Sequence, residues 1–355
     1  MADVPALASP APSRSPRALV IQTAFLGDVV LTTPLLEALA ARHGPVDVVT
    51  TPAAAPLLET HRAVGRVIPY DKKGRDGGPS GLLRLARRLR AERYEVAYLP
   101  HRSLRTALAA WLARIPRRLG FHDGWRVLYT DVVRRPRERH EVDRLLALAA
   151  LTGGAMSQGR PTLETTGEDR AATARFLREH GIEEPFVALA PGSIWGTKRW
   201  PFYEELAGRL ADRTSVVTVG GPEDAALGEQ VVRAGAAAAG RWRAVNACGT
   251  LTLRQSAEVI RRAALLVTND SAPLHLAQAV GTPTVAIFGP TVPAFGFGPR
   301  GPRDRVVELR GLPCRPCSAH GPQRCPLGHH RCMQSLSVED VLQAIEETGA
   351  LRRRD

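Results

Sequence analysis

The feature that most limits how this chain can fold is an alternation of short apolar runs and helical periodicity, which occurs twice. In the first half, an apolar run at 18–22 is followed by a turn at Gly27 and Asp28 and by helical spacing of apolar residues from Val29 to about Arg42. Further strands are predicted at 46–50, 66–69 and 96–99, and further helices at 79–93 and 104–114. This alternation is typical of a parallel sheet covered by helices.

The same alternation begins again after a segment that lacks it. Residues 153–169 mix Gly, Ser, Thr and Pro without sustained periodicity, which is typical of a linker. Beyond them, strands are predicted at 186–190, 215–220, 265–268 and 284–288, and helices at 201–212, 224–234, 252–263, 273–280 and 338–347. We therefore expect an α/β protein with two Rossmann-like domains and an active site between them, at the carboxyl ends of the strands.

The length of 355 residues also favours two domains, because it exceeds the usual size of one hydrophobic core.

Residues 1–16 contain too few apolar side chains to fold into an ordered structure, and they lack the apolar segment of a signal peptide. The chain has no apolar run long enough for a membrane span, so we expect a cytoplasmic location. The expected division is a disordered tail 1–16, a first domain 17–155, a linker 156–170, a second domain 171–336, and a final helix with a basic tail 337–355.

The chain carries a formal charge of +13, from 48 Lys and Arg against 35 Asp and Glu, and should attract anions. Nucleic acid, an acidic membrane and a phosphorylated substrate are all compatible with this charge. Much of the excess lies in the Arg-rich stretches 84–93 and 134–139, which we interpret as solvated surfaces. The charge therefore narrows the class of partner without naming it.

Asp28 is a candidate general base. It lies at the first turn after the first predicted strand, where the preceding Gly27 permits a tight backbone and the start of a helix favours a carboxylate. The alternative is an Asp that only caps the helix.

The loop 190–201 is suited to a diphosphate, because it follows a strand, contains Gly, Ser, Thr and two cations, and ends at a Pro that can open a helix. Its candidate donor-binding side chains are Ser193, Thr197 and Lys198. A purely structural turn braced by its two tryptophans is the alternative.

A second strand-to-helix turn also offers groups for an anion. The N–H groups of Ser271 and Ala272 would be free at a helix start, and His275 follows one helical turn later. Asp270 is placed to orient Lys198 or His275, unless it only caps the helix and His275 only packs. Glu223 and Asp224 follow another strand, where an acidic side chain commonly binds ribose hydroxyls; an exposed turn is the alternative there.

Four of the five cysteines lie within nineteen residues, at positions Cys314, Cys317, Cys325 and Cys332. A Cys-x-x-Cys pair in a cytosolic protein points first to zinc, with His329 or His330 as a substitute ligand. The later gaps of seven and six residues do not repeat the pair. Free thiols, redox-active thiols and disulfides remain alternatives to this structural zinc site.

Several of these motifs occur together in one known family. Gly27-Asp28 with Thr32-Thr33-Pro34, the loop 191–201, and Asp270-Ser-x-x-x-His275 through Gly281-x-Pro283 stand in the order found in glycosyltransferase family 9. Over residues 17–345 the chain resembles these ADP-heptose:lipopolysaccharide heptosyltransferases, in particular the heptosyltransferase II branch.

The resemblance implies a GT-B architecture and an inverting transfer of L-glycero-D-manno-heptose from ADP-heptose to heptose I in the inner core of Kdo-lipid A, without a cofactor. It implies that Asp28 is the general base and that Lys198 contacts the diphosphate. Asp270 and His275 would line the donor phosphates, and Glu223 or Asp224 would bind the ribose. A base for the nucleophile and cations for the departing diphosphate are also what this chemistry requires.

The resemblance also gives the basic surface a purpose, because the acceptor carries phosphates and acidic sugars at the inner face of the inner membrane. The candidate acceptor-binding residues are Lys72, Lys73, Arg102 and Arg105. The Cys-rich segment 314–332 is similar to a stretch in part of the heptosyltransferase II branch, and we expect it to hold a surface loop in place outside the catalytic motifs.

The alternative to this function is a GT-B enzyme that uses another nucleotide-sugar donor or acts at another core position. A zinc-stabilised nucleic-acid-binding protein is a remote one, disfavoured because no basic segment rich in aromatic residues is present, so no nucleic-acid partner is expected.

Overall fold

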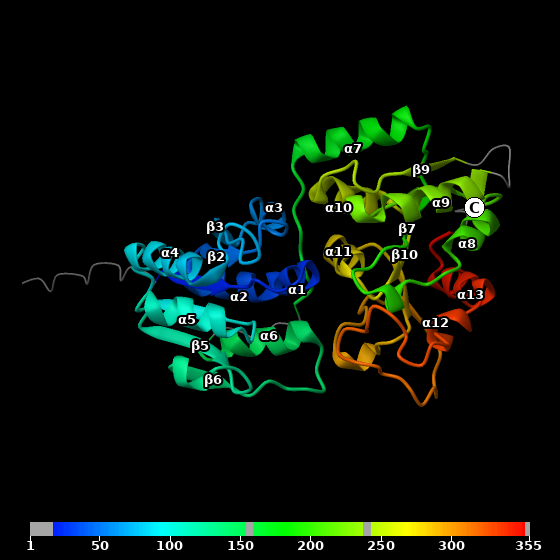
Figure 1. The fold of residues 1–355 in the computed structure, drawn as a ribbon. Helices are drawn as coiled ribbons and strands as arrows, with labels where there is room; N and C mark the ends of the chain where they lie inside the picture. The colour runs from blue at the N-terminus through cyan, green and yellow to red at the C-terminus, as the bar shows by residue number, and fades with distance from the viewer. Residues whose placement is uncertain (1–16, 154–158, 237–242, 352–355) are drawn as a thin grey trace, which may run out of the picture.

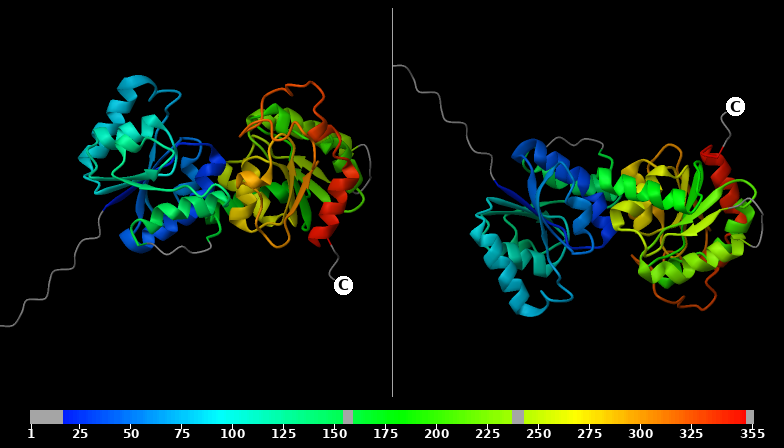
Figure 2. Two further views of the ribbon diagram at one scale, coloured as in Figure 1. Left: turned by 90° about the horizontal axis from the view of Figure 1, so that it is seen from below. Right: turned by 90° about the horizontal axis from the view of Figure 1, so that it is seen from above.

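The computed structural model, which describes residues 17–153, 159–236 and 243–351, forms two lobes that each contain a six-stranded parallel sheet (Figures 1 and 2). The strand order is β3-β2-β1-β4-β5-β6 in the first sheet and β12-β11-β10-β7-β8-β9 in the second. Counted within its own half of the chain, each sheet therefore has the order 3-2-1-4-5-6 of a Rossmann fold. The predicted α/β class with two Rossmann-like domains is confirmed.

The first sheet is covered by helices on both faces. Its strands are β1 (Ala18–Ile21), β2 (Val46–Thr50), β3 (Val64–Pro69), β4 (Val96–Leu99), β5 (Arg117–Phe121) and β6 (Asp131–Val133), and its helices are α1 (Leu26–Leu31), α2 (Thr33–His43), α3 (Ala55–Leu58), α4 (Gly78–Ala91), α5 (Leu104–Leu112) and α6 (Glu141–Ala150). Side chains alternate along each strand. In β1, Leu19 and Ile21 pack with α4 and α5, whereas Ala18 and Val20 pack with α2 and α6.

The second sheet follows the same plan. Its strands are β7 (Phe186–Ala190), β8 (Ser215–Thr218), β9 (Ala244–Asn246), β10 (Leu265–Asn269), β11 (Thr284–Phe288) and β12 (Arg305–Glu308), and its helices are α7 (Gly167–Glu179), α8 (Tyr203–Leu210), α9 (Ala225–Ala236), α10 (Leu253–Arg262), α11 (Ala272–Val280), α12 (Arg331–Gln334) and α13 (Val338–Thr348). Val187 and Leu189 of β7 pack with α8 and α13, and Phe186 and Ala188 pack with α7 and α10. Among the helices of the described ranges, none has both the length and the apolar character that crossing a bilayer requires.

The helix predicted at 29–42 is wrong in one respect, because the structure divides it into α1 and α2 at Thr32. Pro34, the second residue of α2, has no N–H and cannot continue the hydrogen-bond ladder of α1. The Thr32 hydroxyl donates instead to the carbonyl of Asp28 at 2.7 Å. The break ends α1 one turn after Asp28.

The two lobes contact each other through α1 and α11, which lie side by side (Figures 1 and 2). Val30 of α1 and Leu57 of α3 belong to the hydrophobic core of the second lobe. Arg254 of α10 donates to the carbonyl of Pro56 at 2.9 Å. The exact domain boundaries stay predictions. The last residues of the expected linker 156–170 form the first turn of α7, which begins at Gly167. The expected tail 1–16, residues 156–158 of the linker and residues 352–355 of the final segment 337–355 lie outside the described residues.

Candidate active site

Asp28 is the third residue of α1 and is partly buried where the two lobes meet. Its Oδ2 accepts a hydrogen bond from the backbone N–H of Phe25 at 3.2 Å, so it does close the first turn of the helix. This bond occupies only one of the carboxylate's acceptor sites. Burial, and then the negative charge of Glu141, raise the pKa of Asp28 from 3.8 to about 6, which suits a base at neutral pH.

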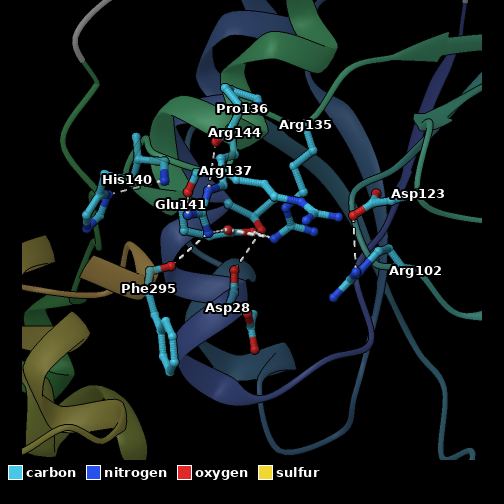
Figure 3. Close-up of polar contacts among 12 residues, drawn as sticks. Asp28, Arg102, Asp123, Arg135, Pro136, Arg137, His140, Glu141, Arg144 and Phe295 are labelled. Atoms are coloured by element: carbon cyan, nitrogen blue, oxygen red, sulfur yellow. Dashed lines mark hydrogen bonds and ion pairs between the residues drawn. The ribbon is translucent and has the colours of Figure 1, made fainter. Parts of the chain in front are cut away.

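A group of charged side chains lies beside Asp28 (Figure 3). Arg135 Nη2 contacts both carboxylate oxygens of Glu141, at 2.5 and 2.6 Å, and Arg144 Nη1 contacts the same carboxylate at 3.1 Å. Arg144 also donates to the carbonyl of Phe295 in the second lobe at 2.8 Å. These residues were not identified from the sequence. The interpretation of stretch 134–139 as a solvated surface is wrong for Arg135, whose side chain is 15% exposed because it pairs with buried Glu141.

Lys198 and Asp270 form a buried ion pair in the second lobe. Lys198 Nζ lies 2.6 Å from Asp270 Oδ2 and 3.1 Å from the carbonyl of the same residue. Asp270 Oδ2 also accepts a hydrogen bond from the hydroxyl of Thr291 at 2.6 Å. Of the two roles that the sequence left open for Asp270, the structure therefore shows contact with Lys198. The ammonium is held by one carboxylate and keeps capacity for a second anion.

Asn269, which the sequence analysis missed, joins the two loops around this pair. Its side chain is fully buried, accepts from Trp200 N at 3.1 Å and donates to the carbonyl of Pro191 at 2.9 Å. An amide at the last position of a buried strand was the available signal. Asn269 thereby fixes the loop that carries Lys198 against the start of α11.

The other residues predicted to bind the sugar-nucleotide donor differ in whether their polar groups already have partners within the protein. Ser193 accepts from Trp195 N at 3.2 Å, whereas the Thr197 hydroxyl donates to the carbonyl of Pro322 at 2.5 Å. The predicted use of Thr197 as a free hydroxyl donor therefore does not match this geometry. Asp224 Oδ2 accepts from Gly221 N at 3.1 Å and closes its own turn, while Glu223 is exposed.

His275 lies at the contact between α11 and α1. It is buried, its Nδ1 has no hydrogen-bond partner among the described residues, and burial lowers its pKa to about 4. A Cβ on Gly27 would lie 2.5 Å from its Cδ2, so glycine is required there. Ser271 and Ala272 form the start of α11, where N–H groups lack intrahelical acceptors. The start of α11 therefore approaches the helix that carries Asp28.

The four predicted acceptor-binding cations differ in their environments. Lys73 and Arg102 are exposed, and Arg102 contacts Asp123 at 3.1 Å. Lys72 Nζ donates to the carbonyl of Thr23 at 2.6 Å, in the segment that leads to α1. Arg105 braces the loop before α4, because it donates to the carbonyls of residues 76 and 78 at 2.6 and 2.7 Å. Its side chain is therefore occupied by the protein itself.

The structure does not support the predicted zinc site. Within the described residues, no group of three or more His, Cys, Asp or Glu side chains is arranged to hold a metal ion. Cys332 packs in the hydrophobic core with α13, and burial, followed by the nearby thiol of Cys317, raises its pKa to about 11. Cys317 itself is exposed. The segment was expected to lie outside the catalytic motifs, but its Pro322 contacts Thr197 of the loop that carries Lys198.

Comparison with known proteins supplies the class of reaction. The model for glycosyltransferase family 9 (heptosyltransferase) matches residues 82–325. The lipopolysaccharide heptosyltransferase 2 of Escherichia coli K12 is 31% identical over 309 residues, covering 82% of this chain and 87% of that protein. This chain belongs to glycosyltransferase family 9. The family decides for an enzyme and against the nucleic-acid-binding alternative.

Two solved structures show the same architecture. A family 9 glycosyltransferase from Veillonella parvula superposes with a TM-score of 0.82 and 27% identity, covering 95% of this chain and 98% of that one. The ADP-heptose lipopolysaccharide heptosyltransferase II of Escherichia coli gives a TM-score of 0.75 and 26% identity, covering 94% and 98%. The expected GT-B architecture is therefore confirmed, and the chain is a glycosyltransferase.

The close approach of α1 and α11 gives a first prediction. Gly27→Ala should force α1 away from buried His275 and lower kcat/KM for transfer by about tenfold or more, because a displacement of about 1 Å can misalign reacting groups. Steady-state kinetics measure the effect. Gly208→Ala is the matched control, since a Cβ there meets nothing within 4 Å, and it should keep the wild-type rate. Full activity in Gly27→Ala would show that transfer does not need this contact.

Proposed function

We propose that this family 9 enzyme transfers heptose from ADP-heptose to the inner core of lipopolysaccharide, at heptose I of Kdo-lipid A, with inversion at the anomeric carbon. The observation that carries the proposal is the contact between α1, which bears Asp28 with its raised pKa, and α11, whose start follows Asp270 of the Lys198–Asp270 pair. A base on one lobe and an anion site on the other are the two groups that displacement of a diphosphate needs.

In this reaction Asp28 accepts the proton of the acceptor hydroxyl, whose oxygen attacks the anomeric carbon as the bond to ADP breaks. Lys198 and the N–H groups of Ser271 and Ala272 stabilise the charge that develops on the diphosphate. Asp270 positions Lys198, and His275 and Ser193 line the same side of the site. Exposed Glu223 binds the ribose, because the Asp224 carboxylate already closes its own turn.

The acceptor approaches Asp28 from the first lobe in this proposal. Burial, and then the charges of Lys72, Arg102 and Arg135, lower the pKa of His101 to about 4, so these three cations lie near the start of the loop that follows β4. An acceptor rich in phosphate and carboxylate groups complements them. Lys73 and the exposed basic residues would contact the anionic inner leaflet, where each Lys or Arg contributes about 1 kcal/mol. We therefore expect the enzyme to act in the cytoplasm, peripheral to the inner membrane.

Donor and acceptor identity are tested together. Purified protein is assayed with ADP-heptose, ADP-glucose and UDP-glucose on lipopolysaccharides truncated before either the first or the second heptose. We expect turnover only with ADP-heptose and on the acceptor that already carries heptose I. The acceptor comparison is needed because a lipopolysaccharide heptosyltransferase 1, from Pseudomonas aeruginosa, is also 31% identical over 318 residues. Preference for another donor or for the heptose-free acceptor would contradict the proposal.

Catalysis should not depend on a divalent cation. Lys198 supplies the charge opposite the diphosphate, and the sequence has no Asp-x-Asp pair after a predicted strand. We expect the rate of transfer to be unchanged when EDTA is added to the assay. A loss of turnover that magnesium or manganese specifically restores would contradict this expectation.

A further inference from the structure

The Cys-rich region forms a cap over the loop that carries Lys198, and the proposed function has not used it. We call residues 313–331 the cap segment. The carbonyl of its Pro322 accepts from both the N–H and the hydroxyl of Thr197, at 3.3 and 2.5 Å. His330 Nε2 lies 2.8 Å from the carbonyl of Thr197, and Gln323 Nε2 donates to the carbonyl of Ile194 at 2.9 Å. The cap segment therefore fixes both sides of the Lys198 loop.

The cap segment also contacts the loop after β11, whose Thr291 hydrogen-bonds to Asp270. Its Arg315 has a side chain that is 5% exposed, and it contacts Glu308 Oε2 at 3.1 Å and the carbonyl of Thr291 at 2.8 Å. The Thr291 hydroxyl in turn donates to Asp270. Both members of the Lys198–Asp270 pair are thus positioned by residues that the cap segment binds.

One exposed side chain of the cap segment, His320, lies between the two lobes. Its ring stacks on Trp195 of the Lys198 loop, with centroids 6.0 Å apart and planes at 10°, and meets Phe25 of the first lobe edge-on at 5.7 Å. Phe25 directly precedes α1, the helix of Asp28. His320 therefore contacts the elements that carry the proposed base and the proposed diphosphate ligand.

The charges of Lys198 and Asp270 both affect the pKa of His320. Partial burial and Lys198 lower its pKa, and Asp270 opposes them, so the imidazole is neutral at pH 7. A neutral imidazole has one N–H to donate, and no hydrogen-bond acceptor for it is found among the described residues. Its aromatic neighbours restrain the ring and leave its edge open for a ligand.

We propose that His320 is a further donor-binding residue, whose N–H donates a hydrogen bond to the terminal phosphate of the nucleoside diphosphate held at Lys198. The inference rests on the proposed function, because it needs a diphosphate in this place. It also gives the Cys-rich region a role, which is to present His320 between Trp195 and Phe25. The bond to an anionic oxygen belongs to the stronger class of hydrogen bonds.

Calorimetric titration of His320→Ala with ADP and with AMP tests the inference without relying on turnover. ADP should bind about tenfold more weakly or worse than to the wild type, because one hydrogen bond to a charged group is lost. AMP lacks the terminal phosphate and should bind both proteins equally. Arg324→Ala is the matched control, an exposed cation of the same segment, and it should bind ADP as the wild type does.

The outcomes separate this inference from the proposed function. Equal affinity of wild type and His320→Ala for ADP would overturn the inference. An equal loss of affinity for ADP and AMP would also overturn it, because His320 would then act on the nucleoside or only hold the loop. A wild-type protein that binds neither nucleotide would contradict the proposed function itself.

Discussion

Asp28→Asn is expected to lower kcat by about 100-fold or more and to leave the affinity for ADP unchanged, because the variant keeps the shape of the side chain but cannot accept the acceptor's proton. Single-turnover transfer and ADP titration measure the two quantities. Wild-type kcat/KM should fall at acidic pH with an apparent pKa near 6, since Asp28 is protonated below that value and cannot act as a base. A variant that retains half of the wild-type rate would exclude Asp28 as the base.

A variant of Glu141, one of the charged residues beside Asp28, tests whether Asp28 is the group that titrates in the pH profile. Glu141→Gln removes a negative charge that raises the pKa of Asp28, and it releases Arg135 from its carboxylate partner. Both effects favour ionised Asp28, so the acid limb of the pH profile should move to lower pH. An unchanged limb would mean that the titration belongs to another group.

Although Asp28→Asn should lower activity, we expect it to maintain or raise the thermal stability of the protein. In the folded protein the pKa of Asp28 is raised from 3.8 to about 6, so the folded state holds the proton more tightly than the unfolded chain does. The cost of ionising Asp28 is absent below about pH 4, grows as the pH rises, and is complete above about pH 6. Asp28→Asn removes this cost, and at pH 7 its Tm should equal or exceed that of the wild type. A clear fall in Tm would show that the carboxylate is needed structurally.

The strand core of this protein was predictable because both sheets are parallel and buried on both faces, so strands such as 18–21 and 186–190 are continuous apolar runs. Strands β5, β6, β9 and β12 were not predicted. Each is partly exposed, and charged or polar residues interrupt its apolar pattern. Local periodicity is thus informative where burial is complete on both faces.

The residues of the candidate site also differ in whether the sequence alone could predict them. Asp28, Lys198 and Asp270 could be found because each follows a strand at its carboxyl end, where the topology of parallel sheets gathers functional groups. Arg135 lies in a loop and Glu141 at the start of α6, both far along the chain from Asp28. Only tertiary contact brings them to Asp28. The zinc prediction is not supported, because the spacing of the cysteines alone cannot show whether their side chains are arranged to hold a metal ion.

The buried pair of Lys198 and Asp270 allows binding and stability to be separated. Lys198→Ala should lower kcat by about 100- to 1000-fold and weaken ADP binding, because a fixed cation at the developing diphosphate charge is lost. The same change leaves Asp270 buried without its cation, which costs about 3–5 kcal/mol of unfolding free energy. A slow variant could therefore be a poorly folded one, and Lys198→Ala cannot decide alone.

The double variant Lys198→Met with Asp270→Asn resolves this, because it removes both charges together and keeps an oxygen that accepts the Thr291 hydrogen bond. Replacing a buried ion pair by neutral groups of similar size is often tolerated, so its Tm should return toward the wild-type value. Its rate of transfer and its affinity for ADP should stay as low as those of Lys198→Ala, since the cation that faces the diphosphate is still missing. Recovery of activity together with stability would show that Lys198 only neutralises Asp270, and the diphosphate would then have to be bound elsewhere.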